Sequence, residues 1–137
     1  MRTVRFGVAV ALVILAFVSV APLSAHHSRA GYDQAKDKLT TLNGVVAEVF
    51  WRNPHVFVTW DSKDDKGAAV RWTGEFSSTA TMLSEGLGRD TFKPGDPLTF
   101  TFMPTKAGTP QGLVIRVVRP DGKVIIDLSE RRGLLEQ

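Results

Sequence analysis

Two runs of strand-like residues meet in the stretch Phe50-Trp51-Arg52-Asn53-Pro54-His55-Val56. Because proline fixes its own φ angle and pushes the preceding residue out of the helical region, Asn53-Pro54 predicts a turn. Before this turn, residues 39–51 mix Thr, Val, Leu and Phe and carry apolar side chains on both faces, as buried strands do. After it, residues 55–60 are β-branched or aromatic at nearly every position. The stretch therefore predicts a hairpin from which the rest of the fold extends.

The hairpin continues into a third strand and a short helix. A polar turn leads to the strand expected over residues 68–76, which completes a three-stranded meander. Ser77-Ser78-Thr79 can cap a helix that runs through Leu87, and the spacing places Ala80, Leu83 and Leu87 on one face. This is the only helix that we expect in the mature chain.

The second half of the chain again favours strands. Lys93-Pro94-Gly95-Asp96 predicts a tight turn of type II, with Gly95 in the left-handed region. It leads into residues 98–103, where Leu and Phe alternate with Thr and Met, the pattern of an amphipathic strand. Two further strands are expected over residues 113–118 and 124–127.

This order of elements predicts an all-β protein with one short helix. Three strands, a short helix and then two or three strands are the order found in OB-type barrels, in which closure removes the exposed sheet edges. We therefore expect a small OB-like barrel of five to six strands. Gly44, inside the first strand, predicts a bulge or a sharp bend.

The N-terminus has the pattern of a secretory signal peptide over residues 1–25. Arg2 and Arg5 precede the apolar run 6–20, and residues 21–25 supply a small-residue end, so cleavage is expected after Ala25. An uncleaved membrane anchor is the alternative, but the apolar run is shorter than the ~20 residues that a spanning helix needs. The sequence predicts a periplasmic or secreted bacterial protein with no membrane span in its mature chain.

The mature chain has room for one domain. Removing residues 1–25 from the 137 of the full chain leaves 112, which we divide into an N-terminal arm over 26–38, a barrel over 39–127 and a tail over 128–137. Tyr32 is the only obvious anchor in the arm.

Composition excludes several classes of function. The 17 basic residues of the whole chain fall to 15 in the mature chain, against 14 acidic residues, and the two signs are interspersed, so no nucleic-acid partner is expected. The chain has no cysteine, which excludes disulfide and zinc-thiolate chemistry. No serine lies in a nucleophile-elbow context, so an enzymatic activity is not predicted.

Several short motifs are spread over the whole mature chain: Ala25-His26-His27-Ser28, Gly44-Val45-Val46, Trp51-Arg52-Asn53-Pro54-His55, Lys93-Pro94-Gly95-Asp96 and Arg119-Pro120-Asp121-Gly122-Lys123. With this set the chain resembles an uncharacterised family of small exported bacterial proteins, described as a domain of unknown function. The resemblance implies a single-domain exported β protein. It implies no activity and no catalytic residues.

The three histidines of the chain, His26, His27 and His55, are candidate metal ligands. After cleavage, His26 would offer an α-amine and an imidazole, a nitrogen chelate that suits Cu(II) or Ni(II). An N-terminal histidine with a distant second one resembles the histidine brace of copper-dependent polysaccharide oxidases and of some periplasmic copper carriers, in ligand type only. Glu75 or Glu48 could add an oxygen ligand, although strand glutamates are expected to face solvent. Copper is thus the candidate cofactor, and the alternative is that these histidines are ordinary surface and turn residues.

A binding module is the second class of function that the sequence allows. OB-type barrels bind oligosaccharides by stacking them on aromatic side chains of one sheet face. Such a platform for an oligosaccharide or an envelope partner would use Trp51, Phe57, Trp60 and Trp72. Strand tryptophans are more often buried in the core, so their exposure decides between the two interpretations.

Overall fold

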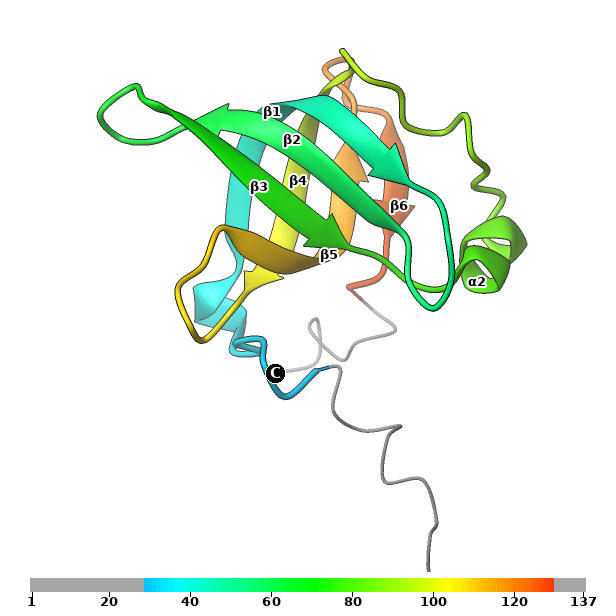
Figure 1. Cartoon of the computed structure of the whole chain (residues 1–137), viewed down its shortest axis with the longest axis horizontal. Helices are drawn as coiled ribbons and strands as arrows, with labels where there is room; N and C mark the ends of the chain where they lie inside the picture. The colour runs from blue at the N-terminus through cyan, green and yellow to red at the C-terminus, as the bar shows by residue number, and fades with distance from the viewer. Residues whose placement is uncertain (1–28, 130–137) are drawn as a thin grey trace, which may run out of the picture.

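The computed structural model describes residues 29–129, in which six strands form one sheet that closes on itself (Figure 1). The predicted signal peptide, His26, His27 and most of the predicted tail lie outside the described residues. The strands are β1 (Thr40–Phe50), β2 (Phe57–Lys63), β3 (Ala69–Glu75), β4 (Pro97–Pro104), β5 (Gln111–Val118) and β6 (Val124–Asp127). The helix α2 (Thr79–Ser84) lies between β3 and β4, and a 3-10 turn, η2 (Lys36–Lys38), precedes β1.

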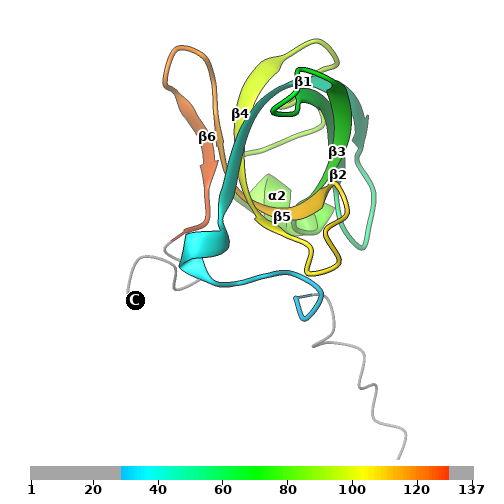
Figure 2. The same cartoon turned by 90° about the vertical axis from the view of Figure 1, so that its left-hand side faces the viewer.

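Sheet closure confirms the predicted fold class. The strand order is β3-β2-β1-β4-β5-β6, and an additional parallel pairing of β3 with β5 closes the first five strands into a barrel. The sixth strand, β6, pairs with β5 and lies outside the ring, as Figure 2 shows. The protein is therefore all-β with one short helix, and its barrel is OB-like.

The hairpin predicted around Asn53-Pro54 is present. Phe50 pairs with Phe57, so residues 51–56 form the loop between β1 and β2. Gly44 has a different role from the bulge or bend that the sequence predicts, because the register shift of β1 lies between Val46 and Glu48. A Cβ atom on Gly44 would lie 2.2 Å from Cδ1 of Trp60, so glycine is needed there for close packing.

The helix α2 is shorter than expected and turns a different face to the core. Ser78 is its N-cap, and its hydroxyl accepts a hydrogen bond from the Thr81 amide at 3.2 Å. The helix ends at Ser84, so the spacing that would place Ala80 and Leu83 with Leu87 is not maintained. Met82 is the buried residue of the helix, whereas Leu83 is 61% exposed.

The barrel interior is built around Trp60. This side chain has no exposed surface, and its ring stacks on Phe100 with centroids 4.1 Å apart. Gly74 contacts the same indole from β3, where a Cβ atom would lie 2.7 Å from Cζ3 of Trp60. A wide aromatic ring thus fills the space that a small closed barrel leaves at its centre.

A second hydrophobic cluster lies outside the barrel wall and orders the N-terminal arm. Its buried members are Tyr32 from the arm, Met103 from β4, and Leu113 and Ile115 from β5. The arm is also tied by its backbone, because the Asp33 amide donates to the Pro104 carbonyl at 2.8 Å. Tyr32 anchors the arm, as the sequence predicts. None of the helices within residues 29–129 has the length and apolar character to cross a membrane.

Candidate functional site

One end of the barrel is organised by the loop between β1 and β2. The Asn53 side chain is fixed to the start of α2, because its Oδ1 accepts hydrogen bonds from the amide and the hydroxyl of Thr79, at 3.2 and 2.7 Å. The Asn53-Pro54 peptide is cis. Backbone bonds between Val56 and residues 76 and 77 continue the contact of the loop with the end of β3. The loop thereby places His55 beside the last residue of β3.

That residue is Glu75, and it pairs with His55. Nδ1 of His55 lies 2.6 Å from Oε1 of Glu75, and the side chain of His55 is one-third exposed. Glu75 itself is buried, with 8% of its surface exposed. The expectation that it faces solvent is therefore wrong, because the arm covers the outer face of the barrel at this point. Glu48, the other candidate oxygen ligand, is exposed on β1.

The second oxygen of Glu75 is held by the arm. The Tyr32 hydroxyl donates to Oε2 of Glu75 at 2.6 Å, and Nε2 of Gln111 donates to the Tyr32 oxygen at 3.3 Å. Burial raises the pKa of Tyr32 well above its ordinary value, the bond to Glu75 raises this pKa further, and the bond from Gln111 opposes the change. Tyr32 therefore remains a neutral donor, and both carboxylate oxygens of Glu75 are occupied.

This arrangement fixes the chemical state of the imidazole. A contact of 2.6 Å between Nδ1 and a carboxylate oxygen requires a proton on Nδ1, so in the neutral ring the lone pair is on Nε2. Within residues 29–129, Nε2 of His55 has no hydrogen-bond partner. A histidine held in this way by a carboxylate is the usual form of a metal-ligating histidine.

The His55–Glu75 pair opens into a cavity of about 310 Å³. Arg29, the first residue that the structure describes, lines this cavity together with His55, Glu75 and Leu113. Phe76 and three hydroxyl residues at the start of α2 complete the lining: Ser77, Ser78 and Thr81. In the described part of the chain, no group of three or more His, Asp, Glu or Cys side chains is arranged so that it could hold a metal ion. The site there contains two such groups, His55 and Glu75.

The four residues of the predicted aromatic platform do not share one exposed face. Trp60 is fully buried, so it cannot stack on a ligand while the barrel is closed. Trp72 packs against it, with ring centroids 6.5 Å apart, and Trp51 is half-buried against the same core. Phe57 lies three residues before Trp60 on β2, and strand alternation therefore directs it to the other side of the sheet. These positions favour a structural role for the tryptophans.

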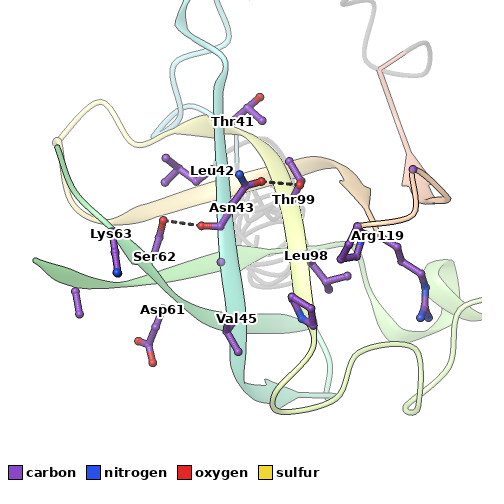
Figure 3. Close-up of a pocket in the computed structure, with 15 residues that line it drawn as sticks. Thr41, Leu42, Asn43, Val45, Asp61, Ser62, Lys63, Leu98, Thr99 and Arg119 are labelled. Atoms are coloured by element: carbon purple, nitrogen blue, oxygen red, sulfur yellow. Dashed lines mark hydrogen bonds between the residues drawn. The ribbon is translucent and has the colours of Figure 1, made fainter. Parts of the chain in front are cut away.

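A second, larger cavity was not predicted from the sequence. It is a groove of about 1030 Å³ over β1 and β4, bounded by the end of β2 and by the turn between β5 and β6 (Figure 3). The sequence does indicate a polar surface there, because Thr99 and Thr101 alternate with buried phenylalanines. That pattern alone does not show that the surface is hollow.

These features define the protein as a small OB-like barrel with a buried carboxylate and a half-buried histidine at one end. The chain belongs to the family of unknown function DUF6152, whose model matches residues 13–116. The predicted resemblance to an uncharacterised domain is confirmed to that extent, and export of the chain stays a prediction. No curated protein and no solved structure matches the chain.

Proposed function

We propose that the mature protein is an exported metal-binding domain that holds a Cu(II)-type ion between His55 and the processed N-terminus at His26. The observation that carries this proposal is the 2.6 Å contact of Nδ1 of His55 with Glu75, which leaves Nε2 directed away from the carboxylate as a free ligand. On this view Glu75 orients the ligand and does not itself bind the metal. Both of its oxygens are already hydrogen-bonded or ion-paired.

The position of Arg29 supports the participation of His26. Arg29 lines the same cavity as His55, and His26 is three residues earlier in the sequence. Three residues of extended chain span at most about 10 Å, so His26 cannot lie far from the cavity that Arg29 lines. His27 follows directly and is the third candidate nitrogen ligand.

The chemistry of this donor set favours Cu(II). An α-amine, the imidazole of His26 and Nε2 of His55 would form a nitrogen-rich set of the kind that Cu(II) and Ni(II) prefer in tetragonal geometry. Arg29 would bring a positive charge near the ion, which favours a site where the ligands include a deprotonated group or an added anion.

Titration of the chain that begins at His26 with Cu(II) tests the proposal. We expect one equivalent to bind with a nitrogen-type electron paramagnetic resonance spectrum. His55→Ala should lower the affinity at least tenfold, and Glu75→Gln should lower it by about 10–100-fold, as loss of an orienting carboxylate does. Glu48→Gln removes an exposed strand glutamate and is the matched control.

A second control blocks the proposed chelate. Acetylation of the α-amine of His26 removes that nitrogen as a ligand and should abolish tight binding, while the fluorescence of the buried Trp60 reports that the barrel is intact. Equal Cu(II) affinity in the His55→Ala chain would remove His55 from the site. Equal affinity in the acetylated chain would remove the α-amine from the site.

A further inference from the structure

The groove over β1 and β4 lies at the opposite end of β2 and β3 from the His55 cavity. It is lined by Lys63 and Ala69, at the ends of these strands that meet in the hairpin turn, whereas the His55 cavity is lined by Glu75 at the other end of β3. The two cavities share no lining residue. Whatever binds in the groove is therefore independent of the proposed metal site.

The floor of the groove presents side chains of β1 and β4. Asn43 pairs in register with Thr99 on β4, and the Thr99 hydroxyl donates to Oδ1 of Asn43 at 2.7 Å (Figure 3). This bond fixes the amide, so the two N–H donors of Asn43 face away from Thr99. On the other side of β1 the Ser62 hydroxyl donates to the Asn43 carbonyl at 2.7 Å. Recognition in this groove can therefore use the side-chain amide of Asn43.

An apolar strip lies next to these polar groups. Val45 is 47% exposed and pairs in register with Pro97. Polar and apolar side chains thus alternate along the floor, and a ligand that fits it must itself have hydroxyl groups beside apolar C–H surface.

The charge of the groove is positive. Lys63 and Arg119 are exposed on opposite sides of the floor, and neither forms an ion pair within residues 29–129 (Figure 3). Asp61 is the only acidic residue in the lining, and Arg71 neutralises it through two hydrogen bonds of 2.8 and 2.7 Å. Nearby, the carboxylate of Asp121 accepts a hydrogen bond from a backbone amide of its own turn.

The separation of the two cations sets the size of the ligand. Lys63 is on β2 and Arg119 lies beyond β4, with β1 between these strands. Neighbouring strands are about 4.8 Å apart, so the backbones that carry the two cations are separated by more than about 10 Å. An extended chain with repeated acidic groups can therefore contact both cations from its place along the floor (Figure 3).

We propose that this groove binds a linear acidic polysaccharide. Carboxylate groups of the chain would lie against Lys63 and Arg119, ring hydroxyls against Asn43 and Thr99, and the apolar faces of the rings against Val45. An acidic peptide would instead add as a strand along residues 41–44 of β1, which β2 leaves unpaired, and the test separates this outcome from binding of a polysaccharide. A lipid is a poorer fit because the exposed apolar strip is too short to hold an acyl chain.

The test is a titration of the isotopically labelled protein with a short oligogalacturonate, against a neutral galactan oligomer of the same length. We expect the acidic oligomer to shift the amide resonances of residues 41–45, Leu98 and Thr99 and the side-chain amide of Asn43, with an affinity that falls as salt is added. The neutral oligomer should bind more weakly. A neutral oligomer that binds equally well overturns the assignment.

Charge variants locate the site. Lys63→Ala and Arg119→Ala should each weaken binding about threefold, which is typical for the loss of one exposed charge pair. Lys66→Ala and Lys123→Ala remove the same charge from the neighbouring turns and are the matched controls. Equal losses in the controls, resonance shifts elsewhere on the barrel, or tighter binding of polyglutamate than of oligogalacturonate would each overturn the proposal. Loss of Cu(II) binding in His55→Ala has no bearing on this result.

Discussion

The Tyr32→Phe substitution removes one hydroxyl group from a buried side chain and leaves its ring in place. That hydroxyl donates a 2.6 Å hydrogen bond to Glu75, which is itself buried. A hydrogen bond to a charged group contributes about 1.5–3 kcal/mol to stability, and a buried oxygen left unpaired loses that contribution. The ring would keep its contacts with Met103 and Leu113, so the cost of a cavity is small. We expect the free energy of unfolding to fall by about 2 kcal/mol.

Urea unfolding at neutral pH, followed by tryptophan fluorescence, measures this loss. The midpoint should fall while the slope of the unfolding free energy against urea stays the same, because the surface exposed on unfolding hardly changes. A double-mutant cycle with Glu75→Gln tests the cause. In that background the uncharged partner accepts a weaker hydrogen bond, so the effect of Tyr32→Phe should shrink by at least half.

Two results would refute this reasoning. A loss below about 0.5 kcal/mol would mean that water replaces the hydroxyl at Oε2 of Glu75, and hence that the carboxylate is not sealed by the arm. An equal loss with and without the charge on Glu75 would mean that Tyr32 acts through packing alone.

Two further predictions concern ionisation and packing. Tyr32 is the only tyrosine in the sequence, and its pKa is raised first by burial and then by its bond to Glu75. The unfolded chain forms tyrosinate as the pH passes about 10, whereas the folded protein should show no tyrosinate absorbance there. Because the unfolded state then holds fewer protons than the folded state, stability should decrease as the pH rises above about 10, and titration of the folded chain near 10 would contradict the buried hydrogen bond. Gly44→Ala should destabilise the barrel by about 1–3 kcal/mol, because its Cβ would overlap Trp60. Gly88→Ala is the control and should change stability little, because its Cβ would have no atom within 4 Å. Equal urea midpoints for the two variants would show that the indole can move.

Local patterns in the sequence were sufficient for the class of fold. Asn53-Pro54 between two β-branched runs predicts the first hairpin, and Lys93-Pro94-Gly95-Asp96 predicts the turn before β4. That turn is present, with a hydrogen bond from the Asp96 amide to the Lys93 carbonyl and a φ of 94° at Gly95. These features depend on residues close together in the chain, where backbone preferences act directly.

Features that depend on distant contacts were not predictable in this way. The need for Gly44 arises from Trp60, which meets it only after β1 pairs with β2. Alternation along β3 places Glu75 on the outer side of the sheet, and nothing in the sequence indicates that the arm covers this point. The predicted face of α2 failed because the helix ends before Leu87 can join it.

Of the three predicted ligands the structure describes only His55, and the contacts around it were not predictable from the sequence. Three histidines at two points of the sequence indicate a nitrogen site. Glu75, the carboxylate that orients His55, looks in the sequence like a strand residue that faces solvent. The burial of Glu75 depends on Tyr32, which reaches this carboxylate only because the arm packs on the outer wall of the barrel. A structure that lacked the arm would therefore show His55 beside a half-satisfied carboxylate.

The two ends of β2 and β3 carry different chemistry, and this difference makes each proposal a control for the other. His55 pairs with the buried Glu75 at one end, whereas Lys63 and Arg119 flank a donor-rich floor at the other. Since the rigid, closed barrel separates the two surfaces and no lining residue is shared, substitutions at one end should leave binding at the other unchanged. If His55→Ala weakened oligogalacturonate binding, or Lys63→Ala weakened Cu(II) binding, the effect would have to pass through the barrel itself, and the independence of the two surfaces would be wrong.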